Sequence, residues 1–225
     1  MIKAYRHHLI GAISSDALSN SPLGKIVCVG RNYADHAKEL NNPIPKQPLL
    51  FIKPATAAVA MDQPITIPKG LGACHHELEM AILIGGVLTH ASAEQAQAAI
   101  AGIGLALDLT LRDVQDDLKR QGQPWERAKA FDGACPLSPF VSAKGIDLQQ
   151  LSLQLYRNDQ LQQSGNTADM LFPVVDLLVE ISQSFSLLPG DVVLTGTPAG
   201  VGPLLVGDKL SAGLGDILTV ETVVE

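Results

Sequence analysis

Three carboxylates stand where the surrounding pattern leaves little room for charge. Glu77 and Glu79 open residues 77–84, whose alternating apolar side chains predict a strand with one buried face. Residues two apart on a strand point the same way, with Cα atoms about 6.5–7 Å apart, so the two charges repel each other. Asp108 interrupts a run that is otherwise uncharged, where an isolated carboxylate is costly to bury.

A divalent cation would resolve all three difficulties if the two strands are neighbours. Oxygen ligands favour Mg²⁺ or Mn²⁺, with Ca²⁺ as an alternative, and Zn²⁺ is disfavoured because no His or Cys is clearly offered. His75 and His76 precede the pair, and we expect a turn or supporting role for them. The competing interpretation places Glu77 and Glu79 on a solvated strand face and Asp108 at a strand end.

Other polar residues have both a chemical and an ordinary interpretation. His36 and Glu39 are three apart on an expected helix at 31–40, so a carboxylate could orient the imidazole for drawing a proton from water. Spacing alone fits a surface pair better. Lys129 is either a solvated lysine or a cation for a developing oxyanion. Arg112 and Gln115 lie near the metal if there is one, and are otherwise surface residues.

A Gly/Pro-rich loop at 195–203 follows an expected strand, and such loops bring backbone N–H groups close to anions. It has neither the P-loop nor the Rossmann glycine pattern, and a plain turn is the alternative. The chain has no Gly-x-Ser-x-Gly elbow, and its cysteines lack the local signature of a nucleophile, which disfavours covalent catalysis.

The elements that must position these residues form a strand-dominated α+β pattern. Short apolar runs separated by Gly and Pro predict strands at 25–29, 49–53, 77–84, 103–111, 152–157, 160–163 and 192–195, with more near the C-terminus. Helices are expected at 31–40, 92–101, 114–121 and, the longest, 172–185, with Pro173 in its first turn. Ser92 and Gln95 predict a capping box, Gly102 a C-cap, and Asn158-Asp159 a hairpin turn between the strands 152–157 and 160–163.

Composition narrows the class of protein. Of 225 residues, 46% are hydrophobic and 17% are charged, which suits one packed domain, expected over residues 1–225, or at most two small ones, and argues against disorder. A net charge of −7 without a Lys/Arg cluster argues against a nucleic-acid partner. We expect no membrane-spanning helix and no secretory signal. Three widely spaced cysteines predict reduced thiols and a cytoplasmic location.

Five stretches, in this order, resemble the fumarylacetoacetate hydrolase family, in particular its small acylpyruvase and oxaloacetate decarboxylase members. They are VCVGRNYADH (27–36), HHELE (75–79), LDLTLRDVQ (107–115), WERAKAF (125–131) and LTGTP (194–198). The resemblance runs from about residue 24 to the C-terminus and leaves 1–23 as an N-terminal extension of unclear role. Leu111 departs from it, since a smaller residue is expected there.

The resemblance implies a mixed β-sandwich roll with one long helix and a short lid helix, and a homodimer. It implies Mg²⁺ held by Glu77, Glu79 and Asp108, in agreement with the strand argument. His36 and Glu39 match the family's water-activating pair, on a lid that orders when ligand binds. Lys129 matches the active-site lysine. The residues that match positions orienting substrate or lid are Arg31, Arg112, Gln115 and Thr197.

The family shares one core among hydrolases, decarboxylases, isomerases and hydratases, so the core does not fix the reaction. We expect a small 2-oxo acid chelated through its C1 carboxylate and C2 keto oxygen. The expected reactions are C3–C4 cleavage of 2,4-dioxo acids and decarboxylation of oxaloacetate, both through a pyruvate enolate. The alternatives are an isomerase, decarboxylase or hydratase of aromatic ring-cleavage products, and a non-catalytic 2-oxo-acid-binding protein, which would have no use for a base.

Overall fold

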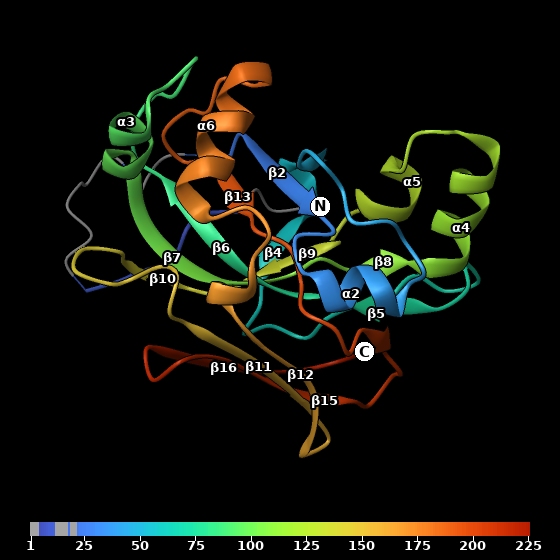
Figure 1. The fold of residues 1–225 in the computed structure, drawn as a ribbon. Helices are drawn as coiled ribbons and strands as arrows, with labels where there is room; N and C mark the ends of the chain where they lie inside the picture. Colours follow the sequence, from blue (N-terminus) through green and yellow to red (C-terminus); the bar gives the residue numbers. More distant parts are fainter. Residues whose placement is uncertain (1–4, 12–17, 19–21) are drawn as a thin grey trace.

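The computed structural model describes residues 5–11, 18 and 22–225, and within them strands dominate (Figure 1). The largest sheet has the order β1-β10-β7-β6-β13-β2-β3, with β9 paired to β7 and β4 paired to β9. Its strands are β1 (Leu9–Ile10), β2 (Lys25–Gly30), β3 (Leu49–Pro54), β4 (Ala58–Ala60), β6 (Leu78–Ile84), β7 (Ile100–Leu107), β9 (Cys135–Leu137), β10 (Phe140–Ser142) and β13 (Val192–Leu194).

Two smaller sheets and several helices surround it. A four-stranded sheet has the order β12-β11-β15-β16, and a three-stranded one β14-β5-β8. Their strands are β5 (Cys74–His76), β8 (Thr110–Leu111), β11 (Ser152–Arg157), β12 (Gln160–Asn166), β14 (Gly202–Pro203), β15 (Lys209–Leu214) and β16 (Leu218–Val223). The helices are α2 (Ala34–Glu39), α3 (Ala93–Ala98), α4 (Arg112–Gln121), α5 (Glu126–Lys129) and α6 (Val174–Ser184), with 3₁₀ turns η1 (Ala55–Ala57) and η2 (Thr167–Asp169). In Figure 1, α3 and α6 lie together, and α4 and α5 lie on the opposite side.

Strand β6 shows how the sheet positions the carboxylates. The predicted alternation is confirmed: Leu78, Met80 and Ile82 belong to the core cluster that includes α6 and the four-stranded sheet. Ala81 and Leu83 belong to a second cluster on the other face. Both faces are therefore buried rather than one, because β7 and β13 flank the strand and layers cover it on each side. Any charge on β6 is consequently inside the protein.

The expected strand 103–111 is interrupted at the chemically important place. Strand β7 ends at Leu107 and β8 begins at Thr110, leaving Asp108 outside the ladder. The backbone N–H of Asp108 donates to the carbonyl of Glu77, whereas that of Leu109 donates to Ala134. This exchange of partner breaks the strand and turns the Asp108 side chain toward β6.

Several local predictions agree with the structure. Ser92 and Gln95 form the expected capping box at the start of α3, but that helix ends at Ala98, and Gly102 lies in β7 instead of forming a C-cap. Helix α4 begins at Arg112, two residues before its predicted start. Asn158 and Asp159 both have positive φ, 51° and 63°, as a two-residue hairpin turn requires. Pro173 is the N-cap of α6.

Part of the N-terminal extension joins the large sheet. Strand β1 pairs with β10 in parallel, and His7 Nε2 lies 2.8 Å from the carbonyl oxygen of Gly190. Residues 1–4, 12–17 and 19–21 of the extension lie outside the described residues. The three cysteines are buried and unpaired, as predicted. None of the helices in the described residues has the length and apolar character needed to cross a membrane.

Candidate metal centre and active-site cavity

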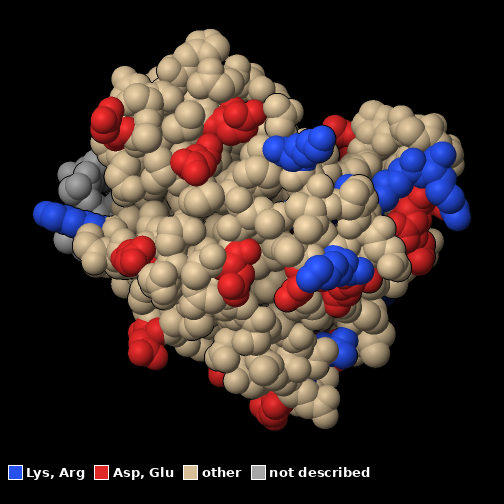
Figure 2. All heavy atoms as spheres, in the orientation of Figure 1, with Lys and Arg blue, Asp and Glu red and all other residues tan. Residues whose placement is uncertain are grey.

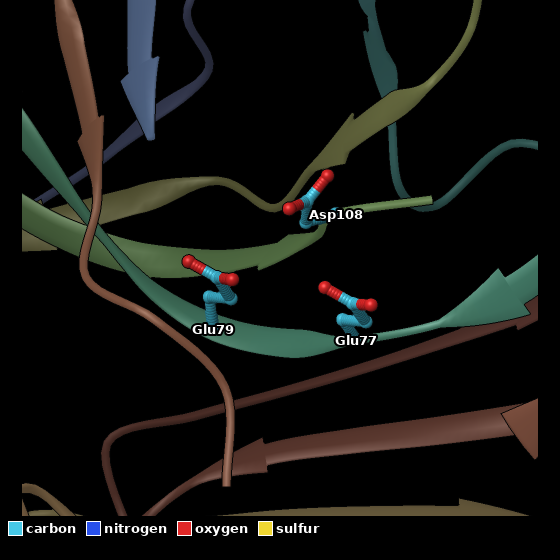
Figure 3. A group of neighbouring side chains, drawn as sticks. All are labelled: Glu77, Glu79 and Asp108. Atoms are coloured by element: carbon cyan, nitrogen blue, oxygen red, sulfur yellow. The ribbon is translucent and has the colours of Figure 1, made fainter. Parts of the chain in front are cut away.

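Glu77, Glu79 and Asp108 converge in the interior (Figure 3). Strands β6 and β7 are antiparallel neighbours with Leu78 opposite Leu107 and Glu79 opposite Ala106, which sets Asp108 across from Glu77. One carboxylate oxygen from each of the three lies within 4.8 Å of the others. The three residues are only 5%, 2% and 1% exposed, so the interpretation that the glutamates line a solvated face is wrong. The predicted convergence is confirmed.

Two buried cations that line the cavity contact these carboxylates. Lys129 Nζ donates to Glu77 Oε2 at 2.8 Å and to Asp108 Oδ2 at 2.6 Å. Arg112 Nη2 donates to Glu77 Oε1. Burial lowers the pKa of Lys129, but the attraction of Asp108 and Glu77 outweighs it and raises the pKa overall. Lys129 is therefore a charged residue of the site, and its interpretation as a solvated lysine is wrong.

A third buried cation, Lys53, was not found from the sequence. Its side chain is fully buried, and Nζ lies 2.8 Å from Asp108 Oδ1. The contact is an ion pair and lacks hydrogen-bond geometry. Nζ instead donates its hydrogen bonds to the carbonyl oxygens of Leu109, Lys129 and Ala134. Lys53 thus connects three backbone segments around Asp108. A lysine in the apolar run 49–53 is an anomaly of the same kind as Asp108 and could have signalled this.

The charge of Glu79 is left without a cation. In the described residues no Lys, Arg or His lies within ion-pair distance of it, and its Oε2 accepts a 2.7 Å hydrogen bond from the N–H of Gly196. Burial, followed by repulsion from Asp108 and Glu77, raises the pKa of Glu79 well above its ordinary value. Burial also raises the pKa of Glu77, but Lys129 and Arg112 outweigh it and lower the pKa overall.

These residues fit a hard divalent cation. The donor set is three carboxylates, Asp108 Oδ1 has no hydrogen-bond partner, and Glu79 has no ion-pair partner among the described residues. Carboxylate oxygens at this separation suit Mg²⁺ or Mn²⁺. A metal bound to all three would remove the repulsion that burial makes costly.

The helix α2 brings His36 into the same cavity. His36 is 5% exposed, and its Nδ1 lies 3.3 Å from Glu39 Oε2, so the two are not an ordinary surface pair. Glu39 Oε1 accepts a 3.0 Å hydrogen bond from the N–H of Gly200, which ties α2 to the loop after β13. The helix begins at Ala34 rather than at the predicted residue 31, and Arg31 precedes it with a left-handed φ of 61°.

The remaining candidates also line the cavity. Gln115 Oε1 accepts from Arg112 Nη1 at 2.7 Å and from Lys119 Nζ at 3.1 Å. The hydroxyl of Thr197 donates to the carbonyl of Leu78 at 2.8 Å, so its hydrogen is already used within the protein. Nine of the ten predicted site residues line this one cavity: Arg31, His36, Glu77, Glu79, Asp108, Arg112, Gln115, Lys129 and Thr197. The tenth, Glu39, contacts it through His36.

Gln163, on β12, is a second residue that sequence reasoning missed. It is fully buried, and its Oε1 accepts from the backbone N–H of Leu78 at 2.9 Å and lies 3.0 Å from His76 Nδ1. Its Nε2 donates to Thr197 Oγ1 at 2.7 Å and to the carbonyl of Pro198 at 3.0 Å. Because the sequence around it is a polar hairpin, nothing local indicated that it supports the cavity. His76 has the supporting role that was expected.

The strand-rich α+β fold encloses three carboxylates, two lysines and an imidazole in one cavity. The chain belongs to the fumarylacetoacetate hydrolase family: residues 25–225 match the family description "Fumarylacetoacetate (FAA) hydrolase C-terminal". The match covers the large sheet from β2 onward and all ten predicted site residues.

Two oxaloacetate tautomerases are similar to this chain over most of their length. The chain is 51% identical to oxaloacetate tautomerase YcgM of Escherichia coli (strain K12) over 209 residues, which is 92% of this chain and 94% of that protein. It is 40% identical to the mitochondrial oxaloacetate tautomerase FAHD1 of Homo sapiens over 201 residues, 89% of this chain and 91% of that one.

Solved structures share the fold. A fumarylpyruvate hydrolase from Pseudomonas aeruginosa, in complex with Mn²⁺ and pyruvate, is 30% identical with a TM-score of 0.90, covering 99% of this chain and 96% of that one. A 5-carboxymethyl-2-hydroxymuconate delta-isomerase from Mycobacterium smegmatis is 37% identical with a TM-score of 0.79, covering 90% and 78%. The predicted family and fold class are thereby confirmed.

Proposed function

We propose that the chain is a divalent-metal-dependent enzyme that acts on small 2-oxo acids and tautomerises oxaloacetate between its keto and enol forms. The observation that carries the proposal is the meeting of the three carboxylates, Lys129 and the His36–Glu39 pair in one cavity. The names of relatives at 51% and 40% identity support oxaloacetate as substrate. The similar structure of a fumarylpyruvate hydrolase in complex with Mn²⁺ and pyruvate supports a site that takes a 2-oxo acid together with a hard metal.

A bound Mg²⁺ or Mn²⁺ at Glu77, Glu79 and Asp108 would polarise the C2 carbonyl and make the C3 hydrogens acidic. The protein supplies the rest of the positive charge. Lys129 is held in its ammonium form by two carboxylates, and Arg112 is buried against Glu77. Both line the cavity, where they stabilise the negative charge that develops on the keto oxygen.

The His36–Glu39 pair acts as the base. With Nδ1 facing Glu39 Oε2, the Nδ1–H tautomer is favoured, which leaves Nε2 free to accept a proton. His36 takes the proton from C3, the C–H electron pair becomes the C2–C3 double bond, and the π pair of the C2 carbonyl moves onto the keto oxygen. That oxygen takes a proton from water, and His36 returns its proton to water, which completes the enol. The hydrogen bond from the N–H of Gly200 to Glu39 fixes the pair relative to the loop after β13, and Gly196 of the same loop donates to Glu79.

Acylpyruvate hydrolysis and oxaloacetate decarboxylation remain as the second candidate. The same pair would take a proton from a water that attacks C4 of a 2,4-dioxo acid, with pyruvate enolate as the leaving group. A fumarylpyruvate hydrolase among the similar structures supports this chemistry. A 5-carboxymethyl-2-hydroxymuconate delta-isomerase is also among the similar structures. It supports the alternative of an isomerase, which moves a double bond within the substrate and cleaves no C–C bond.

Three assays on one preparation test the proposal. The chain is stripped with EDTA and reloaded with Mg²⁺ or Mn²⁺, and enol absorbance of oxaloacetate, CO₂ release and acetylpyruvate cleavage are followed in parallel. We expect metal-dependent equilibration of the enol to be the fastest of the three. Metal-independent tautomerisation would refute the mechanism, and acetylpyruvate cleavage faster than tautomerisation would favour the second candidate. Binding of oxaloacetate without any turnover would revive the non-catalytic binding protein.

We further propose one catalytic domain, a homodimer and a cytoplasmic location. The dimer is supported by the family relationship, and the location by three unpaired buried cysteines. Light scattering on a sizing column tests the dimer, and a mass of about 24 kDa, that of one chain, would refute it.

A further inference from the structure

One face of α4 lines the cavity along most of the helix. Arg112, Gln115 and Lys119 are spaced i, i+3 and i+7, which places them on one side of a helix, and all three line the cavity. The Arg112 side chain is 10% exposed and contacts Glu77, whereas the Lys119 side chain is 25% exposed. The row therefore leads from the buried carboxylates to the outer part of the cavity.

Among the described residues, the charge of Lys119 is only weakly compensated. Its Nζ donates to the neutral amide oxygen of Gln115 and lies 5.4 Å from the centre of the Trp125 ring. Its ion-pair partner Asp116 is 3.8 Å away and 57% exposed, and such a pair contributes little. Figure 2 shows basic and acidic side chains side by side over α4, next to the notch that separates α4 and α5 from the rest of the molecule.

A second cation in the cavity wall, Arg31, has no carboxylate within ion-pair distance in the described part of the chain. Arg31 makes no ion pair within the described residues, and it holds a left-handed φ of 61°, which is uncommon for a residue other than glycine and accumulates at functional sites. Burial lowers the pKa of Lys119, and the positive charges of Arg112, Arg31 and Lys129 lower it further, against the opposing effect of Asp116. These cations repel one another until an anion lies between them.

We infer that Lys119, with Arg31 in the same cavity wall, binds the second carboxylate of a dicarboxylic 2-oxo acid, and that Lys119 determines the preference for such substrates. The inference rests on the proposed function, because the 2-oxo acid end has to lie at Glu77, Glu79 and Asp108. The far carboxylate of a four-carbon substrate then extends along α4. The amide nitrogen of Gln115, which has no hydrogen-bond partner in the described part of the chain, lies between the two ends.

The test compares substrates that differ in the far carboxylate. Lys119→Met removes the charge and keeps the length of the side chain, and Lys119→Arg keeps the charge. Arg120→Met is the matched control, since Arg120 lies next to it on α4, is 76% exposed and pairs with Asp117. We expect K119M to raise the KM for oxaloacetate by roughly tenfold, the effect of about 1.4 kcal/mol of binding energy, and to leave the KM for acetylpyruvate within about twofold. K119R retains the oxaloacetate value, and R120M changes neither.

An equal rise in KM for both substrates, or no rise for either, would overturn the inference. A binding measurement separates this outcome from a failure of the proposed function. With Mg²⁺ present, wild type should bind malate more tightly than 2-hydroxybutyrate, which has a methyl group in place of the far carboxylate, and K119M should lose that difference. If wild type turned over no 2-oxo acid, the function would be wrong, and this pair of ligands would still decide the role of Lys119.

Discussion

The side-chain nitrogen of Gln163 donates a 2.7 Å hydrogen bond to the hydroxyl of Thr197. The same amide accepts a hydrogen bond from the N–H of Leu78, between the two glutamates of the candidate metal centre. Leu78 N–H can only donate and the carbonyl of Pro198, the other acceptor of Nε2, can only accept, so the orientation of the amide is determined. Gln163, on the four-stranded sheet, therefore connects strand β6, at the candidate metal centre, to the loop after β13.

Replacing Gln163 by Glu should weaken this connection, although the two side chains are nearly equal in size. The new carboxylate oxygen would face Thr197 Oγ1 and the carbonyl of Pro198, where donors are required. We expect a loss of about 2–4 kcal/mol in the free energy of unfolding, measured in urea, because buried partners lose hydrogen bonds and gain repulsion. Gln162→Glu, on the same strand but partly exposed, is the control and should change stability by less than about 0.5 kcal/mol. Equal effects of both variants would contradict a specific role for the amide.

Replacing Glu79 by Gln separates stability from metal binding. The amide oxygen can still accept the hydrogen bond from Gly196, while the repulsion with Glu77 and Asp108 disappears. In EDTA we expect the variant to melt higher than wild type by about 2–4 °C, or roughly 1 kcal/mol for a chain of this size. With Mg²⁺ or Mn²⁺, wild type should gain stability and E79Q should not, and all turnover should be lost. Metal stabilisation of E79Q equal to that of wild type would show that Glu79 is not a ligand.

The metal-free protein should lose stability through Glu79 as the pH rises above the ordinary carboxyl range. Its pKa in the fold is raised above the unfolded value of 4.5, so its contribution is present below that value and is lost as pH rises through the folded pKa. Glu77, with a lowered pKa, contributes in the opposite direction and loses its contribution only on acidification. Metal binding to the protonated form must therefore release a proton. Titration calorimetry in two buffers of different ionisation enthalpy measures it, and identical heats would contradict the prediction.

Local pattern was sufficient for much of the fold. Alternation on β6, the capping box at Ser92 and the turn at Asn158 each depend on residues within a few positions, and each was predicted from the sequence. The carboxylates were found because a charge in an apolar strand is energetically conspicuous whatever surrounds it. Their convergence needed one further condition, that β6 and β7 be neighbours.

What the sequence could not supply depends on distant contacts. The strand is broken at Asp108 because successive N–H groups bond to Glu77 and Ala134, which are far apart in the chain. Lys53 and Gln163 acquire their roles only through partners 55 or more residues away for Lys53 and 34 or more away for Gln163. No local period distinguishes such side chains from an ordinary strand lysine or a hairpin glutamine.

Replacing His36 by Ala should divide the reactions of the cavity. Tautomerisation and acylpyruvate hydrolysis both need a base, on C3 in one case and on water in the other, whereas loss of CO₂ from oxaloacetate needs none. General-base catalysis contributes about 10²–10⁴-fold, so we expect losses of that order in kcat for the first two reactions and a much smaller loss in decarboxylation. Glu39→Gln keeps a hydrogen-bond acceptor for His36 Nδ1 without the charge, and its rates should lie between those of H36A and wild type. Parallel measurement of enol absorbance, acetylpyruvate cleavage and CO₂ release on each variant checks this. If all three rates of H36A fell equally, His36 would act in binding or in closure of α2, and the base would have to be sought among the other residues of the cavity.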